Sequence, residues 1–303
     1  MFTSTELLAL QEITSKARLS SYKHVLGTTT LAESYGAYMW NKAIASAFSP
    51  LIQALEVCLR NAMNNTISPA YGQDWFEQWA HRAANDLRTS GKLSAQSEGE
   101  RQVAKAKAKI IQKSRNSSFS WQAVLAELTF GFWVEFLTSK YWDVNQRTKL
   151  WPNHLSAVFP YAPRSMYAHG ALHKEYKAVV DLRNRIHHQE PLWKHACVAN
   201  ADDAIAYLNQ QLQASIARLS YLSPEKLSAL QRYGVIAAIE ERCCKESFLR
   251  FTGQSKGKHT VLRQAKKDLS LLAKTTRDQQ SIWIVSDNSH PKLVLRPASR
   301  RFF

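Results

Sequence analysis

Residues 35–67, YGAYMWNKAIASAFSPLIQALEVCLRNAMNNTI, decide the fold class. Their apolar side chains recur at intervals of three and four, which places them on one face of an α-helix. The same periodicity runs through most of the chain, and 10 glycines and 9 prolines are few for 303 residues. The sequence predicts a mainly α protein, a helical bundle with extra helices. The expected helices cover about 4–26, 31–48, 50–68, 74–90, 96–115, 120–141, 144–151, 166–189, 201–221 and 223–251. Pro50 is expected to start a new helix, because the first turn tolerates proline.

The last quarter of the chain differs in composition. SIWIVS and KLVLRP flank the turn-rich DNSHP, a pattern that predicts a β-hairpin over about 281–297. Residues 242–303 hold 14 Lys or Arg against 4 Asp or Glu, so they carry +10 of the formal +16. We therefore expect a helical domain over 1–222 and a basic C-terminal region, helical with a hairpin, over 223–303.

The charge balance points to a polyanionic partner. With 40 Lys and Arg against 24 Asp and Glu, and a pI near 9.7, the chain should attract nucleic acid. It has no continuous apolar run of about 18 residues and no basic, apolar leader, so we expect a cytoplasmic protein without a membrane partner. The four cysteines are too irregularly spaced for a disulfide framework or a zinc site. We expect reduced thiols, no metal and no cofactor.

A basic helix is predicted over 96–115. Four cations follow one another at intervals of four and form one stripe: Arg101, Lys105, Lys109 and Lys113. Such a stripe suits an RNA backbone, although a solubilising surface helix has the same pattern.

The segment 179–193, VVDLRNRIHHQEPLW, has two arginines, an asparagine and two adjacent histidines at the end of a predicted helix. Pro191 ends the helix, because the residue before proline avoids the α region. Arg183 and His188 are five residues apart, roughly 140° around an ideal helix. One helix does not align them, whereas two copies of the helix would supply both groups to one cleft. The alternative is an ordinary exposed helix end, where histidines interact well with the helix dipole.

Three blocks resemble Abi-like proteins, a branch of the HEPN superfamily linked to abortive infection and toxin-like defence. They are residues 35–67, LAELTFGFWVEFL at 125–137, and LRNRIHHQEPLW at 182–193. The family pattern, Arg-Asn-x-x-x-His-His-Glu-Pro, places its first histidine at His188 and has Gln189 in place of the second. His187 stands where the pattern usually has a small residue, and remains a possible substitute for His188.

The resemblance implies metal-independent RNA cleavage at a homodimeric Arg-x4-His site, controlled by an antitoxin. Arg183, Asn184 and His188, with His187 as the substitute, are the implied catalytic residues. Histidine suits proton transfer near neutral pH, and arginine suits a phosphate that gains negative charge.

A non-catalytic function is the competing hypothesis: an RNA-binding protein of the same fold that holds a structured regulatory RNA. Besides the stripe, the residues we expect to contact RNA are Arg60, Arg185, Lys256, Lys258, Arg263, Lys266 and Lys267. For Arg60, an ion pair with Glu56 one turn earlier is the competing interpretation.

Overall fold

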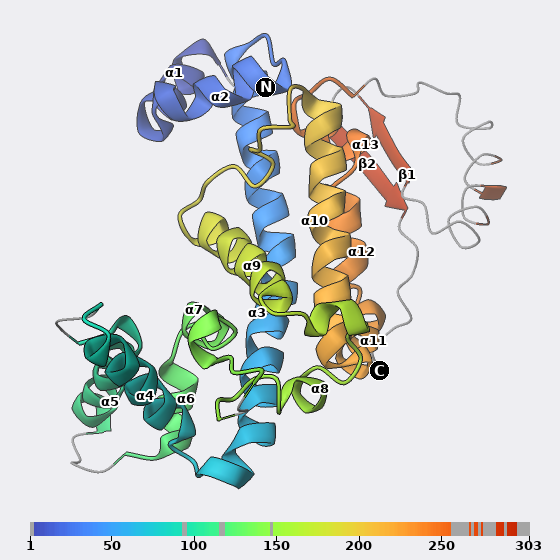
Figure 1. The fold of residues 1–303 in the computed structure, drawn as a ribbon. Coiled ribbons are helices and arrows are strands. Elements are labelled where there is room, and N and C mark those ends of the chain that lie inside the picture. Colours follow the sequence, from blue (N-terminus) through green and yellow to red (C-terminus); the bar gives the residue numbers. More distant parts are fainter. Residues whose placement is uncertain are drawn as a thin grey trace. The chain divides into compact units, whose positions relative to one another are not determined.

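A computed structural model describes residues 3–92, 96–114, 119–145, 148–255, 267, 270, 271, 274, 283–287 and 290–295. The fold is mainly α, as the sequence predicts (Figure 1). The α-helices are α1 Ser4–Thr14, α2 Lys16–Leu26, α3 Leu31–Tyr71, α4 Trp75–Thr89, α5 Glu98–Ser114, α6 Trp121–Glu127, α7 Phe130–Glu135, α8 Leu155–Val158, α9 Ala171–His187, α10 Ala201–Leu222, α11 Pro224–Arg232, α12 Val235–Arg242 and α13 Lys245–Phe251. Two 3₁₀ helices cover Ser139–Tyr141 and Arg164–Tyr167.

Two short strands lie in the segment where the sequence predicts a hairpin. Strands β1 (Trp283–Asp287) and β2 (His290–Leu295) pair antiparallel (Figure 1). A bulge follows Val285.

The helix predicted over 4–26 is two helices. Ser15 separates them with a φ of 75°, and its hydroxyl accepts a hydrogen bond from the Arg18 backbone N–H at the start of α2. Serine is a preferred N-cap because its oxygen satisfies a free N–H of the first turn. The periodicity continues through this break, so the apolar pattern alone does not reveal it.

The predicted break at Pro50 is wrong. Helix α3 continues through Pro50 and Pro69 as one helix of 41 residues. A proline inside a helix removes one hydrogen bond and costs about 3 kcal/mol. Buried side chains at the helical spacing continue on both sides of it, from Ile44 and Phe48 to Leu51 and Leu55. Burying such side chains is worth about 1.5–3 kcal/mol each, which outweighs the proline.

Helix α3 is the one described helix that is long and apolar enough to cross a membrane by length and hydropathy alone. The core helix of a globular protein passes the same test. On α3, Trp40, Ile44 and Phe48 have no exposed surface.

Contacts divide the chain into two compact units. Unit 1 comprises residues 1–51, 185–213 and 228–303, and unit 2 comprises residues 52–184 and 214–227. The division at residue 222 that the sequence suggests stays a prediction.

Trp40 is central to the core of unit 1. Its Nε1 donates to the Arg242 carbonyl at 2.8 Å, and its ring meets that of Phe248 edge to face at 5.1 Å. One turn earlier, Gly36 lies so close to the end of α13 that a Cβ there would sit 2.1 Å from the Phe251 carbonyl oxygen. Helices α12 and α13 therefore pack directly on the first half of α3.

Unit 2 is built around an aromatic cluster. Trp75 and Phe76 of α4 meet Phe132, Trp133 and Phe136 with ring centroids 5.1 to 6.3 Å apart. Such contacts add about 0.5–1.5 kcal/mol per pair beyond the area that they bury. The block at 125–137 is thus a packing element.

We predict that Gly36→Ala lowers the free energy of unfolding by about 1–3 kcal/mol, because the added methyl group must push backbone atoms apart. Urea unfolding followed by circular dichroism measures the change. Gly131→Ala in α7 is the matched control, since its Cβ would meet nothing closer than 3.9 Å. Equal stability of wild type and Gly36→Ala would contradict the close packing.

Candidate functional site at the end of helix α9

The last turns of α9 carry the polar cluster. The apolar face of this helix is buried through Val179, Val180 and Leu182. Arg183 and Asn184, at the end of unit 2, are half-buried, and Arg183 Nη1 donates to Asn184 Oδ1 at 3.4 Å. In the following residues, which belong to unit 1, His187 and His188 are exposed. Both imidazoles are therefore accessible from solvent.

Backbone hydrogen bonds close the C-terminus of α9. The Gln189 N–H donates to the Ile186 carbonyl at 3.2 Å, and the Glu190 N–H donates to the Arg185 carbonyl at 2.9 Å. Gln189 has a φ of 57°, in the left-handed region. These two bonds and the left-handed residue form a Schellman motif, with His188 as the C-cap. The backbone of the histidine pair is held by this turn.

Asn41 of α3 fixes the segment that follows. Its side chain is buried, with 1% of the residue exposed. Asn41 Nδ2 donates to the Glu190 carbonyl at 3.2 Å, and the Leu192 N–H donates to Asn41 Oδ1 at 2.9 Å. The Asn41 amide thus supplies a hydrogen-bond partner to the backbone carbonyl before Pro191 and to the backbone N–H after it. We call these two bonds the Asn41 clamp.

Two further contacts secure the same loop in unit 1. Lys42 Nζ donates to Gln189 Oε1 at 2.8 Å. Trp193 is fully buried and packs edge to face on Tyr22, with ring centroids 5.3 Å apart. The chain that leaves the histidine pair is therefore anchored by hydrogen bonds and by an apolar side chain.

Asn41 is the residue that sequence reasoning missed as a support of the site. It lies next to Trp40 on the side of α3 that also buries Ala37 and Ile44. An asparagine on such a face must satisfy its amide inside the protein. A polar asparagine on an apolar helix face was the available signal, but the sequence does not reveal which groups its amide bonds.

Arg185 is partly engaged by this loop. Its guanidinium donates to the Lys194 carbonyl, and both residues line a small hollow of about 470 Å³ with Glu190 and Pro191. Arg185 is half-buried, so an RNA contact would use its remaining donors.

A protein-family comparison matches residues 9–194 to the family described as Abi-like protein, more than half of the chain. The chain belongs to the Abi-like protein family. Searches of the curated proteins and of the solved structures found no match.

The family match contains the whole arrangement described above. It begins within α1, includes the Asn41 clamp and the polar end of α9, and ends at Lys194. Residues 195–303 of this Abi-like protein, which carry +8 of the formal +16, lie beyond the matched range.

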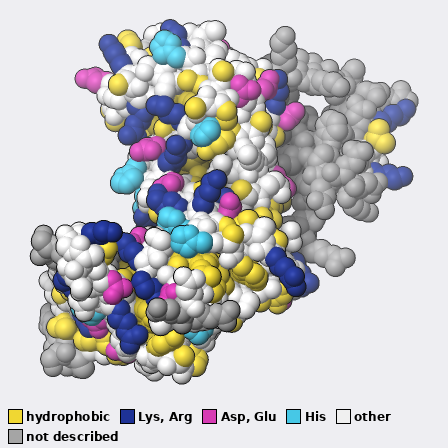
Figure 2. All heavy atoms as spheres, viewed as in Figure 1, with side chains coloured by type: hydrophobic (Ala, Val, Ile, Leu, Met, Phe, Trp, Pro, Cys, Tyr) yellow, Lys and Arg dark blue, Asp and Glu magenta, His cyan; other side chains and the backbone are white. Residues whose placement is uncertain are grey.

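The basic stripe on α5 is exposed but partly neutralised. Arg101 pairs with Glu98 at 2.6 Å, and Lys109 and Lys113 both pair with Glu127. On the face drawn in Figure 2, acidic side chains likewise lie among the Lys, Arg and His side chains. The helix buries Val103 and Ala106 and leaves the stripe, including Lys105, on the surface. The stripe can still meet a polyanion, but with less net charge than its four cations suggest.

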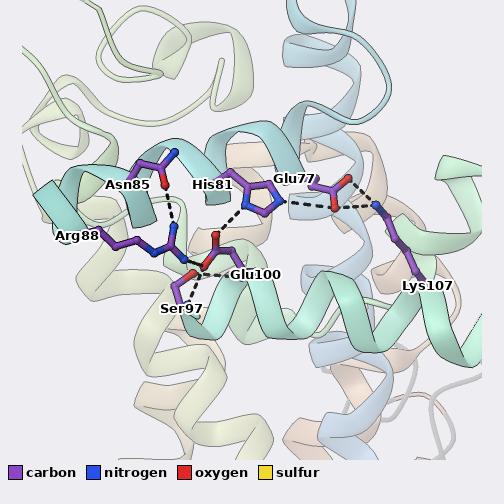
Figure 3. Close-up of polar contacts among 7 residues, drawn as sticks. All are labelled: Glu77, His81, Asn85, Arg88, Ser97, Glu100 and Lys107. Atoms are coloured by element: carbon purple, nitrogen blue, oxygen red, sulfur yellow. Dashed lines mark hydrogen bonds and ion pairs between the residues drawn. The ribbon is translucent and has the colours of Figure 1, made fainter. Parts of the chain in front are cut away.

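A polar network joins α5 to α4 (Figure 3). Glu100 Oε1 contacts His81 Nδ1 at 2.7 Å, and Glu100 Oε2 accepts from Arg88 at 2.6 Å and from the Ser97 N–H at 2.8 Å. Burial alone would raise the pKa of Glu100, but the hydrogen bonds from Ser97, Arg88 and His81 outweigh it and lower the pKa to about 2.

Of the remaining predicted RNA contacts, the structure describes Arg60 and Lys267. Arg60 of α3 is half-buried, and its Nε donates to Asn61 Oδ1 at 3.1 Å. Lys267 is exposed. Lys256, Lys258, Arg263 and Lys266 lie outside the described residues.

Metal-ligating side chains do not gather in the described ranges, where no group of three His, Cys, Asp or Glu residues could hold an ion. The four cysteines, Cys58, Cys197, Cys243 and Cys244, are free thiols, as the sequence predicts.

We predict that Asn41→Ala lowers the free energy of unfolding by about 1–3 kcal/mol, because it leaves the Glu190 carbonyl and the buried Leu192 N–H without a partner. Thermal and urea unfolding measure the loss. The neighbouring variant Lys42→Ala is the control, since its bond to Gln189 is exposed and should change stability by less than about 0.5 kcal/mol. Similar losses in both variants would contradict the clamp.

We predict an acid transition that depends on Glu100. A carboxylate with a lowered pKa in the folded state stabilises the fold above its ordinary pKa, and this contribution is lost as the pH falls. Stability should therefore decline between about pH 4.5 and pH 2. Glu100→Gln should be less stable at pH 7 and should lose less over that interval.

Unfolding free energies measured from pH 7 to pH 2 test this dependence. Glu98→Gln is the control on the same helix, because the Glu98 side chain is 66% exposed. If Glu98→Gln and Glu100→Gln follow the same pH profile, the buried network does not stabilise the fold as described.

Proposed function

We propose that this Abi-like protein is a metal-independent endoribonuclease that acts in abortive infection or as a toxin. One observation carries the proposal: Arg183, Asn184, His187 and His188 lie within six residues at a helix end fixed by the Asn41 clamp. A catalytic site needs its reacting groups held by rigid backbone, and this segment provides it. The resemblance to the HEPN pattern gives these residues their roles.

The reaction uses the ribose 2′-hydroxyl of the substrate as nucleophile. One histidine removes the 2′-hydroxyl proton as the oxygen attacks the adjacent phosphorus. A second histidine donates a proton to the departing 5′-oxygen, which leaves as a 5′-hydroxyl, and a 2′,3′-cyclic phosphate remains. Arg183 stabilises the negative charge that the phosphorane gathers, and Asn184 hydrogen-bonds the phosphate or the imidazole.

A homodimer completes the proposed site. Arg183 and His188 diverge by roughly 140° on one ideal helix. A cleft formed by two copies would contain two of each, so one His188 serves as base and the other as acid. The exposure of the histidine pair leaves it accessible to a second copy. His188 is the preferred catalytic histidine because it keeps the Arg-x4-His spacing, with His187 as the alternative.

The partners follow from the same chemistry. The net charge of +16 favours RNA as substrate. We place the protein in the cytoplasm, where mRNA and tRNA are present, and expect an RNA or protein antitoxin to hold a toxic nuclease in check.

The second candidate function is non-catalytic binding of a structured regulatory RNA. Exposed cations on α5, together with +10 in residues 242–303, exceed what a small cleavage site requires. Binding of this kind should weaken steeply as the salt concentration rises.

We predict that purified protein cleaves tRNA or mRNA in EDTA, and that His188→Ala lowers the single-turnover rate by roughly 10²- to 10⁴-fold, the value of one proton-transfer group. Arg183→Ala should be similarly impaired. His173→Ala, earlier on the same helix, is the matched control and should cleave at the wild-type rate. The products should end in a cyclic phosphate and a 5′-hydroxyl.

Three results would contradict this function in whole or in part. Wild type that never cleaves RNA while binding it tightly would favour the regulatory-RNA alternative. Cleavage by His188→Ala at the wild-type rate, with loss only in His187→Ala, would transfer the role to His187. Sedimentation of the active protein as a monomer would exclude the shared site.

A further inference from the structure

An open groove in unit 1 lies beside the loop that follows the histidine pair. Its volume is about 640 Å³. It is lined by residues of the α1–α2 junction, by residues of α3 and by Gln189. Gln189 is bonded to Lys42 and directly follows His188. A molecule in the groove would therefore lie next to the proposed catalytic histidine.

The groove offers ring faces and apolar surface. Tyr35 and Tyr38 line it with ring centroids 5.9 Å apart. Ile13 and Met39 also line it, and they are 85% and 40% exposed. Bases of single-stranded nucleic acid stack on such aromatic side chains without regard to sequence. The surface thus suits a flat heteroaromatic group.

The groove also has a single sign of charge. Arg18 of α2 and Lys42 of α3 are its ionised groups, and Lys42 Nζ lies 5.1 Å from the centre of the Tyr38 ring. None of the described residues that line it is acidic. The α5 stripe differs, because carboxylates from Glu98 and Glu127 pair with its cations. Arg18 and Lys42 are placed to bind phosphates on either side of a stacked base.

We propose that this groove binds an unpaired nucleotide of an RNA strand, with the base against Tyr38 and the flanking phosphates at Arg18 and Lys42. The inference rests on the proposed ribonuclease function and adds to it the recognition of single-stranded RNA. A duplex hides its base faces, so it cannot use the tyrosine surface. Through Gln189, the bound nucleotide fixes where the strand passes His188.

The test uses the full chain and a fluorescein-labelled oligouridylate of about eight nucleotides with 2′-O-methyl groups, which lacks the attacking hydroxyl. Fluorescence anisotropy should show Tyr38→Ala binding roughly five-fold or more weaker than wild type. Tyr38→Phe keeps the ring and should bind as wild type does. Tyr161→Ala, which removes an exposed tyrosine elsewhere, should also leave affinity unchanged.

Tyr38 also touches Tyr22, so its removal could disturb the core, and a second variant leaves both tyrosine rings in place. Arg18 is exposed, so R18A/K42A should fold normally. Its affinity should fall less with salt, with a slope of log Kd against log salt smaller by about 1.4, or about 0.7 for each lost phosphate contact. Unchanged affinity and slope in this variant, or equal competition by a duplex of the same sequence, would overturn the proposal.

The design separates this proposal from the proposed function. If groove variants weaken binding but wild type cleaves no RNA, the groove stands and the nuclease function fails. If wild type cleaves RNA and the groove variants bind normally, the nuclease function stands and the groove proposal fails.

Discussion

The amide of Asn41 is the contact on which the candidate site depends. It joins a helix from the first quarter of the chain to a loop nearly 150 residues later, through one bond donated and one accepted. Pro191 has no N–H of its own, and the Glu190 carbonyl and the Leu192 N–H on either side of it make no backbone hydrogen bond among the described residues of the loop. The buried Asn41 side chain provides the hydrogen-bond partners that these two groups lack. Its two bonds hold the loop and thereby position the polar end of α9. The Schellman turn and the buried Trp193 add local rigidity, but the Asn41 amide sets where the loop attaches.

The sequence predicted much of the helical content, and for a physical reason. Apolar spacing reports which face of a helix is buried, so the spacing by itself assigns Trp40, Leu51 and Leu55 to the core. The same signal cannot report where a helix stops when the apolar spacing continues past its end. It therefore joined α1 to α2 across Ser15, and the local rule for proline wrongly divided α3 at Pro50. At Pro50 a local preference competed with burial over several turns, and burial prevailed.

The polar residues of the candidate site could be predicted from the sequence, but the residues that hold them in place could not. The order Arg183, Asn184, His187, His188 can be read directly from the chain, and the helix end follows from Pro191. The residues that support the loop after them lie far away in sequence: Asn41 of α3 bonds Glu190 and Leu192, and Lys42 of α3 bonds Gln189. The sequence also overestimates the net positive charge of the α5 stripe, because Glu127, eighteen residues from Lys109, approaches it only in the folded protein. Long-range pairing of this kind produces no periodic pattern in the amino-acid sequence.

The left-handed residue at the end of α9 bears on how the motif can vary. The family pattern has a second histidine where this chain has Gln189, and a φ of 57° is one that histidine adopts more readily than most side chains. The two amino acids are also separated by a single base in the genetic code. Exchange between an imidazole and an amide here can therefore arise in one mutational step without redirecting the main chain. The backbone turn that follows His188 can thus accept either side chain.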